Sequence, residues 1–202
     1  MSGALRKPGR VTFDEYLAFE DATETRHELI NGVIFAMTGG TDRHNLICTN
    51  LTLVIAGPLK GKCQTFQGQM KLRVAHQTDS DGYYPDLMVS CSPTDREPLY
   101  RSEPVLLIEV LSPSTERVDR GEKLINYLNL PSLQEYVLVA QDVPQIEVMR
   151  RHAAWQPEFL FLADSLALES VGLRISVSEI YDTINFQPGR ALTRTRKRKT
   201  TP

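Results

Sequence analysis

The sequence predicts one α/β domain built on a mixed sheet, and two observations indicate it. Residues 105–111 and 136–140 are almost continuously apolar, which is typical of strands covered on both faces. Residues 115–130 between them have apolar side chains at helical spacing, and a strand reached through a helical crossover lies parallel to an earlier strand. The expected core is therefore a helix, three antiparallel strands, a helix and a parallel strand, with extra C-terminal strands.

The length and composition suit a single globular domain. The chain has 202 residues, of which 41% are hydrophobic and 24% charged, and its first residues include no apolar signal segment. The longest apolar stretch is too short to span a bilayer, so we expect a cytoplasmic protein without membrane contact. The cysteines Cys48, Cys63 and Cys91 lie far apart without a CxxC pair. This spacing indicates a reducing compartment and argues against a zinc site or a disulfide scaffold.

Charge is distributed unevenly along the chain. The net charge is −2, but residues 190–202 hold six basic and no acidic residues, which leaves 17 basic against 25 acidic ones before them. We expect an N-terminal arm over 1–11, one domain over 12–189 and a basic, disordered tail over 190–202. The tail is either an arm for nucleic acid or a frayed, solvated terminus. Its candidate nucleic-acid-binding residues are Arg194, Arg196, Lys197, Arg198 and Lys199.

Local signals place the elements before the central strands. Thr12 and Glu15 have the spacing of a capping box, which predicts a short helix to about residue 20. The Asn31-Gly32 pair between two apolar pieces predicts a hairpin over 26–36. Residues 44–58 have helical apolar spacing. We then expect three strands over 63–75, 83–89 and 105–111, antiparallel because their connections are short.

The later elements follow from similar patterns. Ser112-Pro113 opens a turn, and the helix that follows it is expected to end near residue 130. The apolar segment 136–140 is the expected parallel strand. Residues 146–150, 158–162 and 167–175 indicate further strands, and 176–181 a short closing helix.

Two carboxylates stand in segments that otherwise resemble core strands: Asp86 in 83–89 and Glu109 in 105–111. An unpaired ionised carboxylate in such a place costs several kcal/mol, so each must be neutralised, paired or bound to a cation. If the strands are neighbours, the two acids meet on one face, where a divalent cation relieves their repulsion. Mg²⁺ or Mn²⁺ prefers such oxygen ligands. Alternatively, Asp86 bonds local backbone and Glu109 pairs with an arginine.

A lysine in the following helix completes a set of groups suited to metal-assisted phosphodiester hydrolysis. Lys123 follows Glu109 by fourteen residues, and its helix is expected to pack over the same sheet. There it could hold a nucleophilic water or neutralise charge developing on a phosphate. The competing interpretation is an exposed i, i+4 ion pair with Asp119.

These motifs resemble the PD-(D/E)xK nuclease superfamily, and more closely a bacterial family of restriction-endonuclease-like proteins of mostly unassigned function. The resemblance covers about residues 12–150 and rests on Pro85-Asp86, Glu109-Val110 and 112–115, together with the Glu28–Gly32 segment. It implies a restriction-endonuclease-like core. The residues that it implies are metal ligands at Asp86, Glu109 and Val110, catalytic roles for Asp86, Glu109, Lys123 and Glu28, and accessory roles for His44 and Tyr127.

One departure from the superfamily concerns the catalytic lysine. Leu111 stands two residues after Glu109, where the superfamily has a lysine, and Lys123 would have to replace it from the helix. The preferred function is a Mg²⁺- or Mn²⁺-dependent endonuclease acting on nucleic acid, with DNA expected. The alternative is a catalytically inactive homodimer of nuclease fold that binds nucleic acid or protein. Apolar edge strands after residue 144 are compatible with a homodimer in either case.

Overall fold

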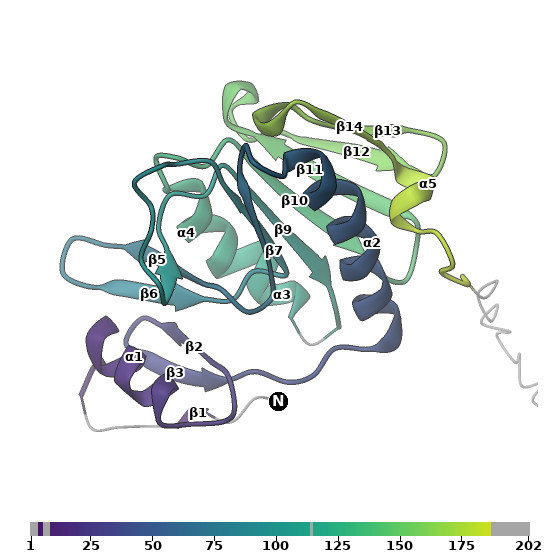
Figure 1. The fold of residues 1–202 in the computed structure, drawn as a ribbon. Helices are drawn as coiled ribbons and strands as arrows, with labels where there is room; N and C mark the ends of the chain where they lie inside the picture. The colour runs from purple at the N-terminus through teal and green to yellow at the C-terminus, as the bar shows by residue number, and fades with distance from the viewer. Residues whose placement is uncertain (1–3, 6–8, 114, 187–202) are drawn as a thin grey trace, which may run out of the picture.

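The computed structural model describes residues 4–5, 9–113 and 115–186 (Figure 1). The expected basic tail over 190–202 lies outside these residues. The helical segments are α1 (Phe13–Asp21), α2 (Asp42–Leu59), α3 (Glu116–Val118), a π-helical turn (Asp119–Lys123), α4 (Leu124–Leu128) and α5 (Val177–Ile180), with single 3-10 turns at Arg151–Ala153 and Glu169–Val171.

The strands form three sheets within the described ranges. They are β1 (Ala4–Leu5), β2 (His27–Ile30), β3 (Val33–Ala36), β4 (Gln64–Gln67), β5 (Lys71–Ala75), β6 (Ser80–Tyr83), β7 (Leu87–Ser90), β8 (Tyr100–Arg101), β9 (Leu106–Leu111), β10 (Glu135–Ala140), β11 (Gln145–Arg150), β12 (Pro157–Phe161), β13 (Ser165–Leu168) and β14 (Leu173–Ser176). The central sheet has the order β12-β11-β10-β9-β7-β4, the second sheet β1-β3-β2-β6-β5-β8, and β13 pairs with β14 alone.

The central sheet confirms the predicted mixed α/β core. β9 and β10 are parallel, with Leu106 opposite Glu135, and the chain joins them through α3, the π-helical turn and α4. β4, β7 and β9 pair antiparallel as predicted, although β5 and β6 of the second sheet lie between β4 and β7 in the chain. Figure 1 shows α2 and α4 on opposite sides of β9.

The alternation of side chains along β9 decides where Glu109 points. Ile108 and Val110 pack in one apolar cluster with Leu51 of α2. Leu107 belongs to the cluster on the other face, which includes Tyr127 of α4. Because successive side chains in a strand point to opposite faces, Glu109 shares the face of Leu107 and lies toward the π-helical turn and α4.

The second sheet carries the hairpin that the sequence predicts. Asn31 and Gly32 join β2 and β3 with φ angles of 51° and 73°, the left-handed conformations that a tight hairpin turn requires. The predicted capping box is also present, with Thr12 as the N-cap of α1 and Glu15 closing it. Tyr16 of α1 is fully buried against this sheet, where its hydroxyl donates to the backbone oxygen of His27.

Two of the predicted strands are wrong as continuous elements. Residues 63–75 divide into β4 and β5, which belong to different sheets. The strand expected over 83–89 is divided in the same way, because Tyr83 ends β6 and Leu87 begins β7. Gly68, with a φ of 53°, permits the first break. Pro85 lies in the second, where it has no N–H to offer a ladder. Asp86 therefore lies in the crossing between the sheets and immediately before β7, not within a strand.

Three further elements differ from prediction. The helix expected over 115–130 contains a π-helical turn, and the strand expected over 167–175 is broken by a 3-10 turn that ends at Gly172. The short strand β8 gave no pattern in the sequence because it contains only two residues. No helix in the described ranges is long and apolar enough to cross a membrane.

The expectation about cysteine pairing is also wrong. Cys63 and Cys91 form a disulfide with a Cα–Cα distance of 4.3 Å. β4 and β7 pair antiparallel with Gln64 opposite Ser90. Cys63 precedes Gln64 and Cys91 follows Ser90, so the two cysteines lie side by side. Cys48 is the free cysteine, and it is buried in α2.

Candidate active site

Asp86, immediately before β7, lies opposite Glu109 on β9. The pairing of Leu87 with Ile108 places position 86 opposite position 109. The backbone N–H of Asp86 donates to Glu109 Oε2 at 3.2 Å, and the backbone N–H of Val110 donates to Asp86 Oδ2 at 2.8 Å. Each carboxylate is thus held by a backbone N–H from the segment that carries the other carboxylate. The Val110 side chain lies in the core on the α2 side, so this residue can reach the acids only through its backbone.

Lys123 reaches this pair from the helical crossover. Its Nζ lies 3.2 Å from Glu109 Oε1, 3.1 Å from Glu28 Oε1 and 3.3 Å from Asp119 Oδ1. The predicted i, i+4 pair with Asp119 therefore exists, but it is buried rather than exposed: Asp119 is 1% exposed and Lys123 5%. The π-helical turn holds both side chains on its inner side. Sequence reasoning missed Asp119 as a site residue, although its spacing from Lys123 was the available signal.

The remaining predicted residues join the same cluster. The Tyr127 hydroxyl donates to Glu109 Oε1 at 3.1 Å, and the Tyr127 ring packs edge-on against two other tyrosines. Glu28, on β2 of the second sheet, accepts from the backbone N–H of Tyr84 at 3.2 Å. His44, in the first turn of α2, lies with its Nε2 3.1 Å from Asp86 Oδ2. The structure thus brings together every predicted site residue that it describes.

The cluster contains more acidic than basic groups. Glu28, Asp86, Glu109 and Asp119 surround one lysine and His44. Burial raises the pKa of Glu109 well above its usual range and also raises that of Asp119. Burial lowers the pKa of Lys123, but Glu109 and Glu28 outweigh it and bring that pKa well above its usual value. The lysine therefore stays charged, and the surplus of carboxylates favours an added cation.

The donor set fits a divalent cation. Asp86 and Glu109 lie opposite each other in the register, each carboxylate accepts a backbone N–H from the segment that carries the other, and Asp86 keeps 22% of its side chain exposed. Among the described residues, Asp119 Oδ1 is buried without a hydrogen bond, and the Lys123 ammonium lies 3.3 Å from it. His44, Cys48 and Asp86 also offer donor atoms that all lie within 4.8 Å of one another. Cys48 is a donor that the sequence analysis did not select.

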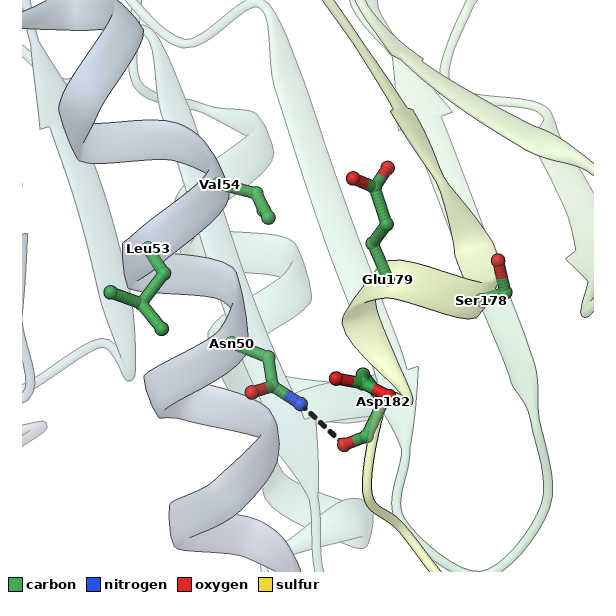
Figure 2. A pocket seen from close by; sticks show the side chains of 6 residues that line it. All are labelled: Asn50, Leu53, Val54, Ser178, Glu179 and Asp182. Atoms are coloured by element: carbon green, nitrogen blue, oxygen red, sulfur yellow. Dashed lines mark hydrogen bonds between the residues drawn. The ribbon is translucent and has the colours of Figure 1, made fainter.

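A separate hollow lies away from this cluster. It has a volume of about 420 Å³ and lies between α2 and α5, as Figure 2 shows. Its lining residues are Asn50, Leu53, Val54, Ser178, Glu179 and Asp182. None of them belongs to the carboxylate and lysine cluster, so this hollow is separate from the candidate site.

Comparison with a solved structure identifies the class of fold. A solved structure from Anabaena variabilis, described as a putative nuclease belonging to DUF820, superposes with a TM-score of 0.69 over 85% of this chain and 97% of that chain, at 20% identity. This likeness shows that the chain has the restriction-endonuclease-like fold of that neighbour.

The sequence comparisons show the family. The chain matches the Uma2 family, described as "Putative restriction endonuclease", over residues 13–178, and it belongs to that family. An uncharacterized protein of Synechocystis sp. is 33% identical over 177 residues, which cover 86% of this chain and 92% of the relative. A second uncharacterized protein of the same organism is 33% identical over 144 residues, or 68% of this chain and 78% of the relative.

Proposed function

We propose that this protein is a metal-dependent nuclease that hydrolyses phosphodiester bonds in nucleic acid, with DNA as the expected substrate. One observation carries the proposal: Lys123 Nζ lies 3.2 Å from Glu109, and Glu109 also accepts the backbone N–H of Asp86. A lysine from the helix thus stands beside the acid pair, although Leu111 occupies the position where the superfamily has its lysine. Membership of a family described as restriction endonucleases supports the same function.

In this proposal, cation binding and charge stabilisation are assigned to four residues. Asp86 and Glu109 would hold Mg²⁺ or Mn²⁺, with Val110 contributing through its backbone. When bound, such a cation polarises a phosphoryl oxygen and lowers the pKa of bound water. Lys123 holds positive charge where charge develops on the phosphate.

Three neighbouring side chains orient these groups. Glu28 positions Lys123 through their 3.1 Å ion pair, and the Tyr127 hydroxyl orients Glu109. His44 orients Asp86 through their 3.1 Å contact. Such orienting contacts matter because a metal ligand or catalytic group displaced by about 1 Å loses much of its effect.

The three carboxylate partners of Lys123 favour a second function. Lys123 is 5% exposed and already has three carboxylate partners, an arrangement that also suits a buried structural network. Under this alternative the protein is a catalytically inactive homodimer that binds nucleic acid or another protein. The two functions differ in whether any phosphodiester bond is cut.

Cleavage of supercoiled plasmid and of single-stranded DNA, assayed with millimolar Mg²⁺ or Mn²⁺, separates them. We expect the native protein to cut, and both Asp86→Asn and Glu109→Gln to lose at least about a hundredfold in rate, because each removes a charged cation ligand. Glu24→Gln, which alters an exposed acid outside the cluster, is the matched control and should cut normally. Absence of cleavage by the native protein on either substrate with either metal would favour the inactive alternative.

A further inference from the structure

A histidine and a cysteine on α2 face the outer side of Asp86. His44 and Cys48 are spaced i, i+4, so they lie on one face of the helix. Cys48 Sγ lies 3.7 Å from His44 Nδ1, and His44 Nε2 lies 3.1 Å from Asp86 Oδ2. One donor atom from each of the three residues lies within 4.8 Å of the others. The nuclease proposal uses His44 only to orient Asp86 and gives Cys48 no task.

The chemistry of these donors differs from that of the carboxylate pair. Mg²⁺ prefers oxygen ligands, whereas a thiolate and an imidazole together suit Zn²⁺ and similar transition metals. Zn²⁺ binds sulfur and nitrogen at about 2.0–2.3 Å, which separates tetrahedral ligands by roughly 3.3–3.8 Å. The donor atoms of His44, Cys48 and Asp86 lie within 4.8 Å of one another, so they would have to approach by about 1 Å at most to reach that separation. Three protein ligands with a fourth position open to water is the usual arrangement of a zinc site that takes part in reactions.

The surroundings keep the histidine in place for such a role. A Cβ atom at Gly40 would lie 2.8 Å from His44 Nδ1, so the absence of a side chain at position 40 leaves room for the ring. The backbone N–H of His44 donates to the Thr41 hydroxyl, the N-cap of α2. The ring is thus held between the loop before the helix, Cys48 and Asp86.

Cys48 is not suited to act as a nucleophile without a metal. It is 5% exposed, and burial raises the pKa of its thiol. A neutral, buried thiol is unreactive, whereas a thiol that coordinates a metal is deprotonated, because the cation displaces its proton to solvent. The two other cysteines are joined in the disulfide and offer no thiolate.

We propose that His44, Cys48 and Asp86 form a second cation position, adjacent to the carboxylate pair, that takes a transition metal of the Zn²⁺ type. It shares Asp86 and the orienting residue His44 with the proposed nuclease centre, and it does not require phosphodiester hydrolysis. Glu109 and Lys123 serve the hard cation and the phosphate, while the α2 residues select a softer ion. The site is therefore one in which two different metals compete for, or share, a single carboxylate.

Titration of the tag-free protein with Co²⁺, a spectroscopic substitute for Zn²⁺, tests this site directly. We expect a thiolate-to-metal absorption band in the near ultraviolet together with visible bands of a four-coordinate ion. Because Cys48 is the free cysteine, the near-ultraviolet band reports on it alone. Cys48→Ser should abolish that band, and His44→Gln should weaken Co²⁺ binding by at least about tenfold. Thr49→Ser, an exposed position on the same helix, should leave both unchanged.

Two outcomes would overturn the proposal: no near-ultraviolet band in the native protein, or a band that persists in Cys48→Ser. A Mg²⁺ titration of the same variants keeps this result separate from the nuclease proposal. Cys48→Ser should retain the Mg²⁺-induced rise in the thermal unfolding midpoint, which also shows that the variant folds. Glu109→Gln should lose that rise but keep the Co²⁺ band. Retention of Mg²⁺ binding without a Co²⁺ band would contradict only the second position.

Discussion

Lys123 is the residue on which the cluster depends. Lys123 forms ion pairs with Glu28, Glu109 and Asp119. It is almost completely buried, as are Glu109 and Asp119. Desolvating a lysine is costly, and only the nearby acids keep it charged. The same geometry therefore serves stability and, under the nuclease proposal, charge stabilisation on a phosphate.

Replacing this lysine should destabilise the protein strongly. Lys123→Met leaves buried carboxylates without their cation, and we expect a loss of about 3–5 kcal/mol in the free energy of unfolding. Lys62→Met, at an exposed lysine, should change that energy by less than about 0.5 kcal/mol. Urea unfolding at neutral pH measures both. A loss below about 1 kcal/mol in Lys123→Met would show that the buried ion pairs contribute little.

Gly82 illustrates how a single missing side chain fixes an element. A Cβ there would lie 2.5 Å from Cε1 of the buried Tyr16 ring. Gly82→Ala should therefore cost about 1–3 kcal/mol through overpacking between α1 and β6. Gly57→Ala is the matched control, because nothing lies within 4 Å of a Cβ at this helical position. It should stabilise by up to about 1 kcal/mol. Thermal unfolding of both variants checks the pair, and equal midpoints would contradict the packing argument.

At the scale of elements, periodicity predicts what is locally encoded. The capping box of α1, the Asn31-Gly32 hairpin and the parallel pair β9 and β10 are confirmed because each depends on short-range pattern or on a single crossover. The breaks within 63–75 and 83–89 were missed because apolar residues flank both of them. Which sheet receives each half depends on pairing with distant strands, and no local pattern encodes that pairing.

In the candidate site, too, some residues could be predicted from the local sequence and others depend on the fold. Asp86, Glu109 and Lys123 could be selected because charged residues in apolar surroundings are visible in the sequence. Asp119 was missed although its i, i+4 spacing from Lys123 was a signal. Cys48 could not be assigned, because its place depends on which side of α2 faces the site. The π-helical turn places Asp119 inward, and the direction of α2 brings Cys48 toward Asp86.

The disulfide between the ends of β4 and β7 should contribute measurably to stability. It joins cysteines separated by 28 positions, and a closed loop of that size is worth about 3–4 kcal/mol in the chain-entropy account. We expect reductant to lower the urea midpoint accordingly. Cys48→Ala protein should show the same sensitivity, since its remaining cysteines are the paired ones. An unchanged midpoint in excess reductant would mean that the bond does not constrain the unfolded chain.

At the scale of the whole molecule, charge is distributed unevenly between residues 190–202 and the preceding part of the chain. We propose that the basic residues beyond 190 bind nucleic acid, since the preceding part of the chain is acidic overall. A chain ending at residue 189 should then bind DNA more weakly, with a shallower dependence of log affinity on log salt. Fluorescence anisotropy at several salt concentrations measures this slope. An identical slope in the shortened chain would assign no nucleic-acid contact to the tail.

The central claim is that Asp86 and Glu109 hold a divalent cation, and thermal unfolding during a Mg²⁺ titration tests it most directly. A ligand that binds the folded state adds about 2.7 kcal/mol of stability at a hundred times its dissociation constant. The native protein and Glu24→Gln should therefore unfold at progressively higher temperature as Mg²⁺ increases to millimolar levels. Asp86→Ala should show no such rise. A native midpoint that does not move with Mg²⁺ or Mn²⁺ would contradict the account and leave the carboxylates as a structural network around Lys123.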